Sequence, residues 1–348
     1  MEKSYSDYLV EIEELTQGNE LMRSLLLDNF YKNLPDDINK NNKELLNQLY
    51  FPLKRKEMWQ CGHENCEIES CYSHEISENL FLKHLADLDS NVVIIEKNIS
   101  GNELFYHEKE VHKRNASNFP GYCSEHDSKL FSDIENCSPS LNEHFVNKQC
   151  LRSIRRKKFD LLLQVSGVDK FVGDIEDELL DSPLVKQVVQ HFEDKKQIIL
   201  ERVSILSKVY DKVYAGINNQ DYCIKYRELG QPKLGYCFSE VFDCTMEEDA
   251  EECILFWFKL DFFEESKIFV CWLDNETSKQ VATQMAADYE HQLLDLMYIK
   301  KEKLVFSSEF LNQMNRDAKD IFLQNDELYK LGLIEKVFLT QEFFEQNI

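Results

Sequence analysis

The stretch Trp59–Ser77, WQCGHENCEIESCYSHEIS, decides how the first half of this chain folds, because it places three cysteines and two histidines within 19 residues. The residues around them are mainly Gln, Glu, Asn and Ser. Cysteine and histidine in a hydrophobic core would have apolar neighbours, so burial alone does not explain this cluster. Thiolate and imidazole groups at this density are typical of a zinc site.

A second pair of zinc-type ligands lies in the segment 118–135, NFPGYCSEHDSKLFSDIE. Its Pro-Gly pair predicts a turn. The residues that follow are acidic at first and then apolar at helical spacing, which predicts the start of a helix. Cys123 and His126 would lie in that first turn, where backbone N–H groups stabilise a thiolate. Cys61 and Cys66, separated by four residues, form the first pair. These four residues predict one structural zinc ion; the alternative ligands in the first stretch are His63, Cys71 and His74.

Composition indicates a folded chain of more than one domain. The 348 residues exceed what one ordinary core fills, and 43% are hydrophobic, which is enough apolar surface to oppose chain entropy. The N-terminus lacks a basic start followed by an apolar block, and no apolar run approaches the roughly 18 residues of a membrane span. We therefore expect a cytoplasmic protein without a membrane partner. The 11 cysteines are then not expected to form disulfides, since cytosolic thiols are kept reduced.

The formal net charge of −24 weighs against indiscriminate nucleic-acid binding. One region is an exception, because nine basic residues accompany six acidic residues between Val111 and Asp160. We expect these cations to contact phosphates if the protein binds nucleic acid; a solvated helix face is the alternative. The candidate nucleic-acid-binding residues are Lys113, Arg114, Arg152, Arg155, Arg156, Lys157 and Lys158.

Periodicity divides the chain into four regions and predicts an α+β fold. Residues 1–53 read as N-terminal helices, and residues 54–150 as a zinc module that includes a hairpin around position 101. Residues 151–216 form a helical connector with a long amphipathic helix, and residues 217–348 a strand-rich α+β domain. Four aromatic and β-branched runs predict the antiparallel sheet of that last domain, at residues 222–229, 234–243, 252–263 and 266–273.

The order of a cysteine knuckle, strands and a helix that opens with ligands resembles treble-clef zinc modules, including HNH endonucleases. By this resemblance His74 would be the general base, Asn118 would orient it, and Asp127 would hold a catalytic Mg²⁺ or Mn²⁺ ion. The positions of Asn118, five residues before Cys123, and of Asp127, directly after His126, match the HNH pattern. The chain departs from it in carrying Ser73 where an acid is usual, His126 in place of a cysteine, and a longer gap between His74 and Asn118.

The segment Phe119–Glu135, FPGYCSEHDSKLFSDIE, also resembles a group of uncharacterised bacterial proteins. Their shared pattern is Cys-x4-Cys, then Ser-His, then FPGFC-x2-HD-x2-LF-x2-IE. The resemblance implies a shared zinc site and layout, and a place among phage-defence or mobile-element genes. It brings no established activity with it.

Three functions remain open at this point. The first is an HNH-like endonuclease that cuts DNA or RNA, with DNA favoured, by means of His74, Asn118 and Asp127. The second is a zinc-braced interaction module whose acidic surface docks onto a basic protein or mimics nucleic acid. The third is nucleic-acid binding without cleavage. The matching positions of Asn118 and Asp127 narrowly favour the endonuclease. The sequence does not indicate the substrate, the trigger or the oligomeric state.

Overall fold

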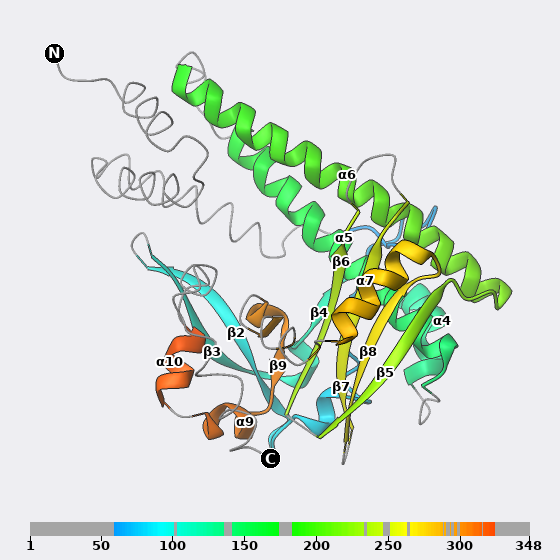
Figure 1. The fold of residues 1–348 in the computed structure, drawn as a ribbon. Coiled ribbons are helices and arrows are strands. Elements are labelled where there is room, and N and C mark those ends of the chain that lie inside the picture. The colour runs from blue at the N-terminus through cyan, green and yellow to red at the C-terminus, as the bar shows by residue number, and fades with distance from the viewer. Residues whose placement is uncertain are drawn as a thin grey trace. The chain divides into compact units, whose positions relative to one another are not determined.

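The computed structural model describes residues 59–323, with gaps at 101–102, 136–140, 174–182, 233–234, 246–250, 263–264 and 315 and at several positions between 288 and 299 (Figure 1). The predicted N-terminal helices of residues 1–53 lie outside the described residues. The chain forms two compact units. One comprises residues 1–56, 99–103 and 162–200, and the other comprises residues 57–98, 104–161 and 201–348.

The main sheet has seven strands, all in the second unit except for the hairpin tip: β2 (Asn91–Ser100), β3 (Glu103–His112), β5 (Ile224–Pro232), β6 (Tyr236–Asp243), β7 (Ile254–Asp261), β8 (Glu265–Leu273) and β9 (Val305–Phe306). Their order across the sheet is β3-β2-β9-β6-β7-β8-β5. Every strand pair whose register is described is antiparallel. The two-residue strand β9 pairs with β2 on one side and with β6 on the other, so it joins the hairpin to the C-terminal strands.

Both faces of the sheet are covered, which explains why its central strand β7, ILFWFKLD, is buried at all eight positions. On one face, side chains such as Phe238 and Trp257 pack in a core with Ala282 of α7 (Glu276–Ala287). On the other face, the ring of Phe269 lies 6.5 Å from that of Phe145 on α5 (Glu143–Gly173). The apolar runs of the sequence are therefore strands of a sheet that is buried on both faces.

The remaining helices follow in chain order around these elements (Figure 1): α4 (Ser124–Glu135), α6 (Pro183–Asn219), α9 (Ser308–Gln313) and α10 (Arg316–Leu323). Three short 3-10 helices are η1 (Leu82–His84), η2 (Lys113–Asn115) and η3 (Lys301–Lys303). The long helix α6 begins at a proline, whose fixed φ suits the first helical position. Among the described residues, no helix has the length and apolar character needed to cross a membrane.

A second sheet of only two strands, β1 (Tyr72–His74) and β4 (Asn118–Pro120), forms the centre of the cysteine-rich region. The strands are antiparallel, and α4 starts four residues after β4 ends. The long hairpin β2–β3 is inserted between β1 and β4 in the sequence but pairs in the main sheet. The insertion explains the long separation between His74 and Asn118.

The predicted α+β class, the antiparallel sheet and the long helix are confirmed. The predicted strands near 222–229, 234–243, 252–263 and 266–273 correspond to β5, β6, β7 and β8. The hairpin expected around position 101 is found as β2 and β3, and it belongs to the same sheet as the C-terminal strands.

Candidate metal centre

The first ligand pair lies on a tight loop that starts the described chain. Cys61 donates its backbone N–H to the carbonyl of Ile68 at 2.9 Å, and Cys66 donates to the carbonyl of His63 at 3.2 Å, which folds the loop back on itself. Asn65 completes the turn with φ of +57°, a left-handed conformation that asparagine tolerates better than most residues. The loop thus brings both thiol groups to one end.

The second pair lies where β4 runs into α4. Cys123 is buried just before the helix, and its carbonyl accepts the backbone N–H of Asp127 at 2.9 Å. The cysteine loop is tied to this junction, because Gly62 donates its N–H to the carbonyl of Gly121 at 2.9 Å. Cys71, at the entrance to β1, likewise donates to the carbonyl of Tyr122 at 2.7 Å. Backbone hydrogen bonds therefore hold the two ligand-bearing segments together.

Four ligand atoms converge at this contact. The Sγ atoms of Cys61, Cys66 and Cys123 and one ring nitrogen of His126 all lie within 4.8 Å of one another. His126 Nδ1 is 3.5 Å from Cys61 Sγ and 3.2 Å from Cys123 Sγ. Cys66 Sγ is 4.0 Å from Cys123 Sγ. A zinc tetrahedron with Zn–S of about 2.3 Å and Zn–N of about 2.0 Å has ligand atoms roughly 3.5–3.8 Å apart, so this Cys3His group could hold a zinc ion.

The electrostatics of the cluster also suit a metal. Burial opposes ionisation of Cys123, yet hydrogen bonds from the backbone N–H of His126 and from neighbouring thiols leave its pKa lowered. Burial raises the pKa of Cys61 to about 11. Desolvation, together with the neighbouring His63, lowers the pKa of His126, which favours the neutral imidazole that binds metals. The thiol of Cys123 is thus prepared for ionisation. A bound cation would offset the burial that raises the pKa of Cys61.

The alternative ligands of the first stretch lie outside the four-residue group. His63 instead stacks on His126, with ring centroids 3.9 Å apart and planes 8° from parallel. Its Nε2 is 3.0 Å from the hydroxyl of Tyr214 on α6, and its Nδ1 is 3.0 Å from the carbonyl of Glu64. His63 therefore fixes the orientation of the His126 ring.

His74 and Asn118 are direct cross-strand partners on the two-stranded sheet. The carbonyl of Arg114 accepts hydrogen bonds from both side chains, from His74 Nε2 at 3.0 Å and from Asn118 Nδ2 at 3.3 Å. A carbonyl only accepts, so Nε2 carries the proton when the ring is neutral. The His74 side chain is 23% exposed, and its Nδ1 is left with the lone pair.

Asp127 lies in the first turn of α4, and among the described contacts none joins it to His74. Its Oδ1 is buried and has no hydrogen-bond partner within the described part of the chain. The negative charge of Asp127 contributes, after burial, to the raised pKa of Cys71. The structure therefore brings His74 and Asn118 together and leaves Asp127 near the cysteines.

Two arginines of α5 point into the protein. Arg152, 1% exposed, pairs with Glu135 at 2.8 Å and lies 4.0 Å from the centre of the Phe131 ring. Arg155, also buried, donates to the carbonyls of Gly121 and Gln60 at 3.0 and 3.2 Å.

The neighbouring cations are also engaged within the fold. Arg156 donates to Asp160 at 3.1 Å and to the carbonyl of Asn118 at 3.0 Å. Lys157 pairs with Glu240, and Lys158 lies 5.4 Å from the centre of the Tyr210 ring. Each of these three side chains therefore makes a contact within the protein.

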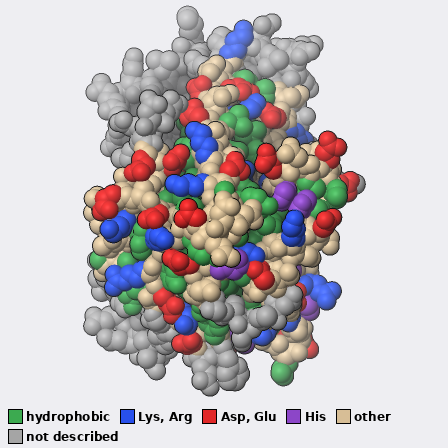
Figure 2. All heavy atoms as spheres, turned by 90° about the vertical axis from the view of Figure 1, so that its right-hand side faces the viewer, with side chains coloured by type: hydrophobic (Ala, Val, Ile, Leu, Met, Phe, Trp, Pro, Cys, Tyr) green, Lys and Arg blue, Asp and Glu red, His purple; other side chains and the backbone are tan. Residues whose placement is uncertain are grey.

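Closer to His74, the Arg114 side chain is exposed and Lys113 is 3.8 Å from Glu78. Figure 2 looks onto the side that carries α4, and acidic and basic side chains are interspersed over the residues drawn in colour, without an extended area of one sign.

Sequence reasoning missed a buried cluster of charges around Glu75, the residue after β1. Asp160 is paired with Arg156 and with Lys303 of η3. Burial raises the pKa of Glu75 to about 7 in spite of Arg156 and Lys303, whereas burial of Asp160 is outweighed by the same two cations, which lower its pKa to about 2. No local pattern marks this cluster, because its members come from separate elements.

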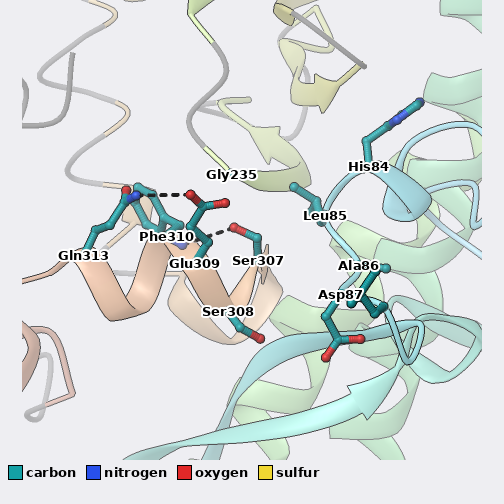
Figure 3. Close-up of a pocket in the computed structure, with 11 residues that line it drawn as sticks. His84, Leu85, Ala86, Asp87, Gly235, Ser307, Ser308, Glu309, Phe310 and Gln313 are labelled. Atoms are coloured by element: carbon teal, nitrogen blue, oxygen red, sulfur yellow. Dashed lines mark hydrogen bonds between the residues drawn. The ribbon is translucent and has the colours of Figure 1, made fainter.

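A separate pocket of about 540 Å³ lies between the loop after η1, Gly235 and the first turn of α9 (Figure 3). Ser307 caps α9 by accepting the N–H of Phe310 at 3.2 Å, and Gln313 donates to Glu309 at 3.4 Å. None of the predicted ligands or catalytic residues lines this pocket. It is therefore distinct from the metal centre.

Comparison with protein-family models, with curated protein sequences and with solved structures gives no match. The resemblances to HNH modules and to the bacterial Cys-x4-Cys group thus have no support beyond the residues quoted for them. The metal-type cluster itself stands on its geometry.

Proposed function

We propose that this protein is a zinc-braced hydrolase of nucleic acid, in which His74 is the general base of an HNH-like endonuclease. Zinc would bind Cys61, Cys66, Cys123 and His126 and fasten the cysteine loop to the start of α4. The succession of loop, β1, β4 and α4 would then be a treble clef with the hairpin β2–β3 inserted. DNA is the expected substrate rather than RNA, and a role in phage defence stays a prediction.

The observation that carries this proposal is the shared carbonyl of Arg114, which accepts from both His74 and Asn118. Hydrogen bonding at Nε2 holds the ring in one tautomer and leaves Nδ1 to take a proton from water. A histidine placed only for packing would not need a cross-strand amide on the same acceptor. Partial exposure of the ring leaves room for a substrate to approach.

Asp127 is the residue that would hold a Mg²⁺ or Mn²⁺ ion. Support comes from its buried Oδ1, for which the described residues supply no hydrogen-bond donor. A buried acceptor without a donor is unusual, and a divalent cation would satisfy it. When bound, the ion would stabilise negative charge on the phosphate. Of the proposed phosphate contacts, Arg114 is exposed and adjoins His74, so we assign it the main role.

The test is cleavage of supercoiled plasmid and of single-stranded DNA by zinc-loaded protein with Mg²⁺ or Mn²⁺. We expect His74→Ala to slow cleavage at least about 100-fold, the usual contribution of a general base. His107→Ala is the matched control, because His107 lies on β3 and pairs with Glu96. Equal cleavage by wild type and His74→Ala would exclude His74 as the base, and zinc-loaded wild type that cuts neither substrate would exclude the nuclease.

The inward-facing arginines favour a second candidate, the zinc-braced interaction module with an acidic surface. Arg152 and Arg155 are committed to Glu135 and to backbone carbonyls, while the net charge of the chain is −24. An acidic surface would attract a basic protein. Salt-sensitive binding to poly-lysine together with no DNA binding and no cleavage would support this candidate. Failure to bind poly-lysine at low salt would count against it.

A further inference from the structure

A hydrogen-bonded chain of four side chains lies at the end of α4 away from the metal centre. The hydroxyl of Tyr222 is 3.0 Å from Nδ1 of His144, and Nε2 of His144 is 2.8 Å from Oδ2 of Asp133. Lys148 Nζ donates to both carboxylate oxygens of Asp133 at 2.7 Å. The order is therefore tyrosine, imidazole, carboxylate and ammonium.

The contacts determine which atom holds each proton. Burial of Asp133 is outweighed by hydrogen bonds from Lys148 and His144, which lower its pKa and keep it anionic. An anionic carboxylate only accepts, so Nε2 of a neutral His144 carries the proton. Nδ1 then accepts from the hydroxyl of Tyr222. This is the order of a nucleophile, its base and the group that orients the base.

Three elements hold this chain in place. Asp133 is on α4, while His144 and Lys148 are one turn apart on α5. Tyr222 lies between α6 and β5, and its neighbour Ile224 is held on α5 by Asn147, which accepts the N–H of Ile224 and donates to its carbonyl, both at 3.2 Å. The tyrosine hydroxyl is thereby positioned against the imidazole by the backbone.

Burial alone does not require this alignment. The side chains of His144 and Asp133 are 33% and 49% exposed, and Tyr222 is half-buried, so water could satisfy their polar atoms. Buried Lys148, 8% exposed, needs Asp133 as its partner, but it does not need His144 or Tyr222. His144 and Tyr222 are therefore arranged without any demand from the core.

We propose that Tyr222 is an activated nucleophile that takes an acyl group from a carboxylic ester, with His144 as its general base. Its surroundings favour a neutral electrophile over a phosphate. Asp133 lies in the chain, Asp221 precedes Tyr222, and nearby Lys225 is 3.4 Å from Glu143. A phosphate dianion would be repelled by these carboxylates, whereas an ester would not.

The step balances without a further reactant. As the Tyr222 oxygen bonds to the ester carbon, its proton passes to Nδ1 of His144, and the imidazolium pairs with Asp133. Collapse of the tetrahedral intermediate breaks the bond between carbon and leaving oxygen, and His144 returns the proton to that oxygen. The products are acyl-Tyr222 and an alcohol.

The experiment is incubation of the full chain with p-nitrophenyl acetate, with p-nitrophenolate release followed by absorbance and the acetylated residue located by peptide mass spectrometry. We expect Tyr222 to be the tyrosine acetylated fastest. His144→Gln should slow its acetylation at least about 10-fold, a conservative figure for loss of a general base. Tyr222→Phe should remove the initial burst of p-nitrophenolate.

Tyr226→Phe is the matched control, because the Tyr226 hydroxyl lies 3.4 Å from the carbonyl of Leu141 and has no described contact with an imidazole. That variant should keep the burst. Thermal unfolding of each variant shows whether the fold is kept. If His144→Gln is unfolded, the test of the proposal is whether Tyr222 of the wild type is acetylated faster than its other tyrosines. Acetylation of Tyr222 at the rate of those tyrosines, or at an equal rate in folded His144→Gln, would overturn the proposal.

Discussion

The guanidinium group of Arg155 donates a hydrogen bond to the carbonyl of Gly121 at 3.0 Å and another to the carbonyl of Gln60 at 3.2 Å. Arg155 thus links α5 to both segments that carry the candidate metal ligands. Arg155 is therefore a structural link, and this determines what its substitution should do.

We expect Arg155→Ala to lower the free energy of unfolding by about 2 kcal/mol, because the buried carbonyl of Gly121 and the carbonyl of Gln60 lose a charged donor. Urea denaturation measures the change. Lys129→Ala, at an exposed position of α4, is the control and should change stability by less than about 0.5 kcal/mol. An Arg155→Ala protein as stable as wild type would contradict the structural role.

Metal analysis of the purified protein should find one zinc ion per chain, and removal of the ion by a chelator should lower Tm, since the four ligands join two segments. Cobalt substitution should give the intense thiolate-to-metal absorption of a three-cysteine site. Cys66→Ser should lose the ion, whereas Cys71→Ser should retain it, because Cys71 is outside the ligand group. Equal metal content in the two variants would argue against this ligand set.

Glu75 should make the protein less stable as pH rises. Its pKa in the folded protein, about 7, lies above the ordinary value of 4.5, so its contribution to stability is complete below pH 4.5 and is lost as pH rises through about 7. Glu75→Gln, which is neutral at every pH, should therefore unfold less readily than wild type at pH 8, by on the order of 3 kcal/mol.

The control for Glu75 is Asp160→Asn, for which the sign is reversed. The folded pKa of Asp160, about 2, lies below its ordinary 3.8, so its stabilisation is present above that value and is lost as pH falls through about 2. Asp160→Asn should accordingly be less stable than wild type at pH 7. Parallel stability–pH curves for wild type and Glu75→Gln would show that Glu75 does not titrate as described.

Gly62→Ala should destabilise the metal centre, because a Cβ at this position would lie 2.1 Å from Nε of buried Arg155. Either the arginine or the cysteine loop must move, so zinc affinity should fall together with stability. Gly173→Ala, where a Cβ meets nothing within 4 Å, is the control and should be neutral or mildly stabilising. Zinc competition with a chromogenic chelator measures the affinity. Unchanged affinity in Gly62→Ala would mean that the loop adapts at no cost.

Local patterns in the sequence were sufficient to predict α6 and the strands β5 to β8, because periodicity and residue type are properties of neighbouring positions. The convergence of two cysteine-rich segments could also be predicted, since metal chemistry relates ligands that are far apart in the chain. The directions of Arg152 and Arg155 could not be predicted. Whether an arginine on a helix contacts solvent or a carbonyl depends on the element packed against it, which no local pattern specifies.

The same limit applies to β9 and to the chain from Tyr222 to Lys148. A strand of two residues has no detectable period, and its pairing with β2 and β6 depends on contacts between distant segments. Asp133, His144 and Tyr222 are unremarkable singly, and only the packing of α4, α5 and β5 relates them. Sites built from separate elements without a metal-ligand pattern are therefore difficult to predict from the sequence.

The bridging position of β9 has a consequence for how the protein emerges from the ribosome. The hairpin that ends at His112 is synthesised long before Val305, yet among the described strands β9 alone joins it to the rest of its sheet. At roughly 5–20 residues per second, the hairpin waits about 10–40 s with an open edge. During translation the unpaired edge of the hairpin could pair with other nascent chains. We therefore expect chaperones to bind the nascent chain mainly in that interval.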